Sequence, residues 1–118
     1  MYLYTMEKGN LNNTALKIII VDDSTLYRRV MKEFLEMELS YEIIGEAHNG
    51  EVFLQMDNLN LADIILMDLQ MPRVSGFQSA QRMSIQYPDI KMIAVTMYTD
   101  NLYLNQLVDL GFKGCIYK

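Results

Sequence analysis

The fold is decided by the stretch Ile64-Ile65-Leu66-Met67-Asp68-Leu69-Gln70-Met71-Pro72-Arg73-Val74-Ser75-Gly76. It opens as an unbroken apolar run, reaches a carboxylate at Asp68, and then passes through a proline and a glycine. Buried strands of parallel sheets have such short, continuous apolar sequences. Open α/β sheets carry their chemistry just outside the carboxyl ends of these strands. We therefore expect Asp68 to point into a functional site; the alternative is that it only caps the turn that follows.

Composition narrows the class of protein. The 118 residues are 51% hydrophobic and 21% charged, which fits one folded domain with a substantial core. The net charge of −5 argues against a nucleic-acid-binding surface on this segment. The single cysteine cannot form an internal disulfide, and no apolar run approaches the roughly 18 residues of a membrane span. The first residues also lack a signal-peptide pattern, so we expect a cytoplasmic protein that does not enter the membrane.

Apolar runs and helical periodicities alternate along the chain. The predicted strands are 17–21, 42–47, 63–68, 91–96 and 114–118, and the predicted helices are about 25–39, 52–56, 75–87 and 100–110. Short links join them, so the pattern predicts an α/β fold with a parallel sheet and helices on both faces. Residues 1–16 show no clear period and are assigned as a leader, which leaves 17–118 as one domain.

Polar side chains lie at the carboxyl ends of four of the predicted strands. They are Asp22, Asp23, Asp68, Thr96 and Lys118. If these strands are neighbours, three carboxylates, a hydroxyl and an ammonium group meet in one crevice. Like charges this close need a compensating charge, and Mg2+ suits carboxylates together with waters and a phosphate group. The set is suited to phosphoryl transfer, with Asp68 as the nucleophile.

These residues resemble the receiver domain of two-component response regulators. The resemblance covers residues 17–118 and rests on the Asp22-Asp23 pair, Asp68 with Met71, Pro72 and Gly76 at the family's offsets, Thr96, and Lys118. It implies a flavodoxin-like fold whose five parallel strands lie in the order 2-1-3-4-5. The stretches 95–98 and 111–114 look most like receivers attached to LuxR-type helix-turn-helix output domains, which implies control of transcription.

The resemblance also implies a role for each site residue. Asp68 would accept a phosphoryl group from a sensor histidine kinase or a phosphotransfer protein. Asp23, Asp68 and the backbone carbonyl of Gln70 would bind Mg2+, with Asp22 assisting through water. Thr96 and Lys118 would contact the phosphoryl group. Such a protein is a phosphoacceptor that promotes its own phosphorylation and dephosphorylation, not an enzyme acting on other molecules.

Three features depart from the family pattern. Cys115 stands three residues before Lys118, where receivers usually carry the Tyr or Phe of a switch; we expect a small buried residue there, with Tyr98 as the substitute. Met97 is bulkier than the family's usual residue after the threonine. The family's fifth helix is absent from this chain, so we expect self-association to form a homo-oligomer, or cover of the sheet by the leader.

One alternative function remains open, and two others disagree with the sequence. A degenerate receiver could act by contact alone, as a phosphorylation-independent protein-interaction module. A dinucleotide-binding oxidoreductase needs a glycine-rich turn after the first strand, where this chain has residues 22–25 in the sequence DDST. An aspartate-nucleophile phosphatase typically carries a second aspartate two residues after the first, where this chain has Gln70.

Overall fold

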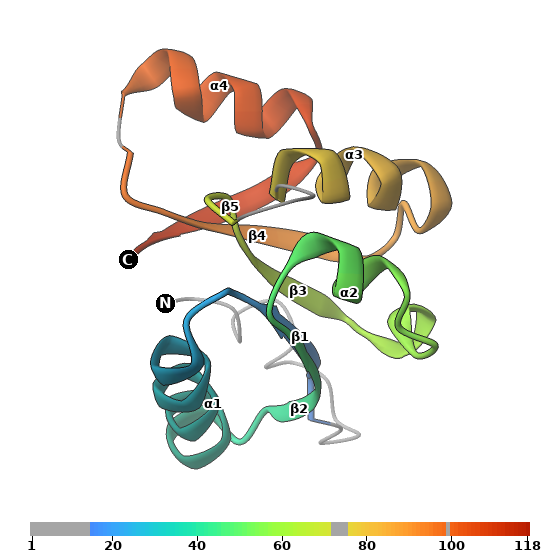
Figure 1. The fold of residues 1–118 in the computed structure, drawn as a ribbon, viewed down its shortest axis with the longest axis vertical. Coiled ribbons are helices and arrows are strands. Elements are labelled where there is room, and N and C mark those ends of the chain that lie inside the picture. Colours follow the sequence, from blue (N-terminus) through green and yellow to red (C-terminus); the bar gives the residue numbers. More distant parts are fainter. Residues whose placement is uncertain (1–14, 72–75, 99) are drawn as a thin grey trace.

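A five-stranded parallel sheet forms the centre of the molecule (Figure 1). The computed structural model describes residues 15–71, 76–98 and 100–118. The strands are β1 (Lys17–Val21), β2 (Glu42–Ala47), β3 (Ile64–Asp68), β4 (Lys91–Thr96) and β5 (Phe112–Tyr117). Their order is β2-β1-β3-β4-β5, which confirms the predicted topology and places β3 at the centre of the sheet.

Helices cover both faces of the sheet, as predicted. They are α1 (Thr25–Leu39), α2 (Gly50–Leu54), α3 (Gly76–Gln86) and α4 (Asn101–Asp109), with a 3-10 turn, η1 (Leu59–Leu61), that the sequence did not indicate. Figure 1 shows α1 on one face and α2, α3 and α4 on the other. Because both faces are covered, β3 is buried along its whole length. Within the described ranges, no helix is long and apolar enough to cross a membrane.

Helix α1 forms where the periodicity predicted it, but the side of the helix that is buried is not the one that the predicting residues occupy. The residues whose spacing indicated the helix are all exposed: Leu26, Val30, Phe34 and Met37. The side chain of Leu35 is fully buried instead, and Tyr27, Met31 and Leu39 pack beside it on the sheet. The helix carries two adjacent apolar stripes at the same spacing, so the period fixes the helix but not which stripe faces the core.

Strand β5 begins earlier than predicted, at Phe112 in place of residue 114. Phe112 is buried and pairs with Met92, and the register shifts directly after this pair, because Ile93 pairs with Gly114. The sequence did not indicate a strand start at Phe112, because glycines stand at 111 and 114, and glycine is a poor strand residue that usually signals a turn. Leu16, assigned to the leader, is also buried, and its carbonyl accepts a hydrogen bond from the Glu42 amide at 2.8 Å.

Two expectations fall outside the described residues. The leader segment 1–14, which was one proposed cover for the sheet, is not described, and neither is the part of the motif between 72 and 75. The motif residues on either side of that gap are both buried, Met71 after β3 and Gly76 at the start of α3.

Gly76 lets the start of α3 approach the end of β3 closely. A Cβ atom at this position would lie 2.5 Å from the carbonyl oxygen of Asp68 and 2.8 Å from the Cα of Leu69. Both are backbone atoms, so neither can rotate away. The glycine is therefore needed to pack the helix against the strand that carries the candidate nucleophile.

Gly76→Ala is expected to lower the free energy of unfolding by about 2 kcal/mol, as overpacking typically does. The matched control is Gly114→Ala, where a new Cβ would meet the Cδ1 of Ile93 at an ordinary 3.5 Å. Urea unfolding of both variants measures the difference. Equal stability of the two variants would contradict the steric account.

Candidate functional site

The topology brings the predicted strand-end residues to one edge of the sheet. Asp22 follows β1, Asp68 ends β3, Thr96 ends β4 and Lys118 follows β5. Because β3 lies between β1 and β4, Asp68 occupies the middle of this group. Carboxylate oxygens of Asp22, Asp23 and Asp68 all lie within 4.8 Å of one another. The predicted acidic cluster therefore exists, built from two adjacent strands.

The ammonium group of Lys118 bridges two carboxylates of the cluster. Its Nζ lies 2.8 Å from Oδ2 and 3.1 Å from Oδ1 of Asp22, and 3.3 Å from Oδ2 of Asp68. The two carboxylates are almost fully buried, with 1% of Asp22 and 3% of Asp68 exposed. Such charges require compensation, and the ammonium group supplies part of it.

Burial and charge both act on the two central groups. Desolvation, followed by the negative charge of Asp22, raises the pKa of Asp68, although the Gln70 amide and Lys118 oppose the shift. Burial alone would lower the pKa of Lys118, but its hydrogen bond to Asp22 and the charges of Asp22 and Asp68 outweigh this effect and raise it. A second cation would favour the ionised form of Asp68 further.

An aromatic ring on α1 also contacts the ammonium group. The Nζ of Lys118 lies 4.8 Å from the centre of the Tyr27 ring, within the range of a cation–π interaction. Desolvation and the nearby Asp22 carboxylate raise the pKa of the Tyr27 phenol, so it stays neutral. Tyr27 thus helps to place Lys118, a contact that the sequence did not indicate.

Backbone groups fix the orientation of the two buried carboxylates. The Ser24 amide donates to Oδ1 of Asp22 at 2.8 Å, and the Gln70 amide donates to Oδ1 of Asp68 at 3.1 Å. Nη1 of Arg28 donates to the Asp22 carbonyl at 2.7 Å and holds the loop after β1. Gln70 is thus adjacent to the cluster, while binding of a metal by its carbonyl stays a prediction.

The cluster has the donor set that a hard divalent cation requires. It combines two buried carboxylates of restricted orientation with a third, Asp23, that is exposed to solvent. Mg2+ favours one or two carboxylates together with several waters, and the exposed side at Asp23 leaves room for those waters. The residues that are present therefore fit Mg2+.

Thr96 is buried, with 1% exposed, and its hydroxyl makes two hydrogen bonds. Its Oγ1 accepts from the Tyr98 amide at 3.1 Å and donates to the Tyr103 hydroxyl at 3.3 Å. Tyr103 was missed in the sequence. The sequence feature that could have indicated Tyr103 is the predicted helix N-cap at Asp100. The side chain of Asp100 accepts a hydrogen bond from the Tyr103 amide, which places Tyr103 in the first turn of α4, beside the end of β4.

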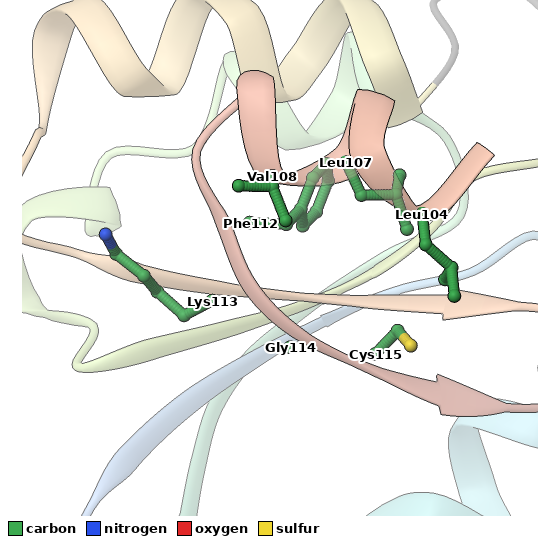
Figure 2. Close-up of a pocket in the computed structure, with 7 residues that line it drawn as sticks. All are labelled: Leu104, Leu107, Val108, Phe112, Lys113, Gly114 and Cys115. Carbon is green, nitrogen blue, oxygen red and sulfur yellow. The ribbon is translucent and has the colours of Figure 1, made fainter. Parts of the chain in front are cut away.

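The expectation that Cys115 is buried is wrong. Its thiol is free and the residue is exposed on β5. It lies at a hollow of about 250 Å³ between α4 and β5, which is also lined by Leu104, Leu107 and Gly114. Figure 2 shows these residues. This hollow beside α4 leaves Cys115 on the edge strand open to solvent.

The fold and the acidic strand-end cluster together define a receiver-type domain. Residues 18–118 match the response regulator receiver domain, which is nearly the whole chain. The chain therefore belongs to the response regulator receiver domain family of two-component signalling. This confirms the family that the strand-end residues indicated.

Relatives and solved structures agree with this assignment. The chain is 30% identical over 108 residues to the transcriptional regulatory protein DegU of Brevibacillus brevis, covering 92% of this chain and 46% of DegU. It is 36% identical over 102 residues to the transcriptional regulatory protein YdfI of Bacillus subtilis (strain 168), covering 86% and 47%. The chain thus spans about half the length of these relatives.

A solved structure with the same fold is that of the CheX-CheY-BeF3-Mg2+ complex from Borrelia burgdorferi. The match has a TM-score of 0.80 at 21% identity and covers 87% of this chain and 78% of that one. At this level of identity, the likeness establishes the fold alone.

Proposed function

We propose that this receiver domain accepts a phosphoryl group on Asp68 in a Mg2+-dependent reaction. The observation that carries the proposal is the burial of Asp68 between two further carboxylates and the ammonium of Lys118. A buried carboxylate at the centre of compensating charge is the arrangement that phosphoryl transfer needs, because the reaction depends on positioning and charge neutralisation.

Each neighbouring residue has a distinct role in this proposal. An oxygen of Asp68 attacks the phosphorus of the donor, and the bond from phosphorus to the donor's leaving group breaks. Asp22, Asp23, Asp68 and the carbonyl of Gln70 would hold Mg2+, which when bound neutralises negative charge at the phosphoryl group. Lys118 would add a further positive charge beside Asp68, and the hydroxyl of Thr96 would donate to a phosphoryl oxygen.

The partners follow from the family and from the relatives. The phosphoryl group would come from a sensor histidine kinase or a phosphotransfer protein. The relatives are named as transcriptional regulatory proteins and are about twice as long as this chain. We therefore propose that phosphorylation of Asp68 controls an output in transcription, and that the domain is a phosphoacceptor and not an enzyme acting on other substrates. The assembled cluster supports this function over a phosphorylation-independent interaction module.

Removal of the metal tests the proposal. Incubation with acetyl phosphate and Mg2+ is expected to add the mass of one phosphoryl group to most molecules, measured on the intact protein. The same incubation with excess chelator is expected to leave the mass unchanged, because three carboxylates then repel the incoming phosphate with only the ammonium group of Lys118 to compensate them. Equal mass gain with and without chelator would overturn the Mg2+ requirement.

A further inference from the structure

The hydroxyl of Thr96 is already engaged before any phosphoryl group is present. It has one hydrogen, and that hydrogen is donated to the Tyr103 hydroxyl at 3.3 Å. The same oxygen of Thr96 also accepts a hydrogen bond from the Tyr98 amide at 3.1 Å. Any new acceptor near Thr96 must therefore compete with Tyr103.

Tyr103 joins the end of β4 to two helices. It lies in the first turn of α4, and its amide donates to the N-cap Asp100 at 2.9 Å. Its ring packs edge-on against Phe77 of α3, with centroids 5.8 Å apart, and against Tyr98, with centroids 5.2 Å apart. Movement of its hydroxyl thus requires rearrangement of packed rings on α3 and α4.

A phosphoryl group on Asp68 is such an acceptor, and the inference rests here on the proposed function. Asp68 pairs in register with Val95, the residue directly before Thr96. If the Thr96 hydrogen moves to a phosphoryl oxygen, the Tyr103 hydroxyl loses its donor. One hydrogen cannot serve two acceptors fully. The bond from Thr96 to Tyr103 and the bond from Thr96 to a phosphoryl oxygen therefore exclude each other.

We propose that Tyr103 is a positioning residue for Thr96. It holds the threonine hydroxyl away from the site in the unphosphorylated protein and is released when Asp68 is phosphorylated. Helix α4 thereby senses the state of the site through a hydrogen bond at its first turn. Neither Cys115 nor Tyr98 can take this role: Cys115 has no ring or hydroxyl, and Tyr98 contacts Thr96 through its backbone amide.

The test compares two variants that each lose one phenol oxygen. Tyr103→Phe keeps the ring packing and removes the competing acceptor, whereas Tyr98→Phe removes the oxygen from the neighbouring, 48% exposed ring. Beryllium fluoride with Mg2+ serves as the phosphoryl mimic, and calorimetric titration measures its affinity. We expect Tyr103→Phe to bind it about fivefold more tightly than the wild type, and Tyr98→Phe to bind it equally.

The sign of this effect separates the proposal from a merely structural role, since a variant that only damages the site binds more weakly. The inference is overturned if Tyr103→Phe binds beryllium fluoride no more tightly than the wild type, or if Tyr98→Phe gains as much affinity as Tyr103→Phe. In either case, binding of beryllium fluoride by the wild type leaves the proposed function intact. Failure of the wild type to bind beryllium fluoride and to accept phosphate from acetyl phosphate overturns both.

A spectroscopic measurement on the wild type provides a second test that needs no variant. With tyrosine labelled at Cζ, the Tyr103 resonance is expected to shift when beryllium fluoride and Mg2+ are added, because its hydroxyl loses the bond from Thr96. The amides of residues 101–109 are expected to shift with it. A Tyr103 signal that stays in place while the Asp68 amide shifts would overturn the inference alone.

Discussion

Asp68→Asn is expected to abolish phosphoryl uptake from acetyl phosphate at any Mg2+ concentration. The amide has no carboxylate oxygen with which to attack phosphorus, so the reaction path is removed and not only slowed. The fold should persist, because the amide has nearly the same shape and its oxygen can still accept from the Gln70 amide. Intact mass after incubation measures uptake, and circular dichroism checks the fold.

The matched control for this change is Asp89→Asn, an exposed aspartate in the turn between α3 and β4. It alters the net charge by the same amount but lies away from the cluster, so its uptake should equal that of the wild type. Wild-type uptake in Asp68→Asn would show that another residue is the phosphoacceptor.

Lys118→Met is expected to produce the second large effect, on stability. The change leaves the buried Asp22 carboxylate without the ammonium group that lies 2.8 Å away. Breaking one partner of such a pair leaves an uncompensated buried charge, so the free energy of unfolding should fall by about 3 kcal/mol in the absence of Mg2+. Saturating Mg2+ should reduce this loss, because the cation compensates the same carboxylates.

Urea unfolding of Lys118→Met with Mg2+ and with chelator measures both parts of this prediction. Lys113→Met is the control, since Lys113 is an exposed lysine earlier in the same strand. Its stability should change little, and equally in both solutions. A loss in Lys118→Met that does not depend on Mg2+ would mean that the lysine and the metal do not share the cluster.

The sequence predicted the central geometry because that geometry depends on a simple rule. Apolar runs mark the strands, and in a parallel sheet all carboxyl ends lie at one edge. A residue that follows such a run, such as Asp68 or Lys118, is therefore placed by the strand itself. To predict that the carboxylates and the lysine converge, it was only necessary to assume in addition that these strands are neighbours.

The features that the sequence did not predict depend on tertiary packing. The period of α1 could not decide whether Leu26 or Leu35 faces the core, because both stripes are apolar. The exposure of Cys115 depends on how closely α4 approaches β5, which no local pattern records. The bond from Thr96 to Tyr103 joins a strand end to a helix start across a short link, and its partner could be found only from the helix cap at Asp100.

The central claim is that the phosphoryl group resides on Asp68, and reductive mapping tests it most directly. Borohydride converts an aspartyl phosphate into homoserine, which peptide mass spectrometry locates. After incubation with acetyl phosphate and Mg2+, homoserine is expected at position 68 and at neither Asp22 nor Asp23. Homoserine at position 22 or 23, or a phosphorylated protein that yields none, would contradict the account.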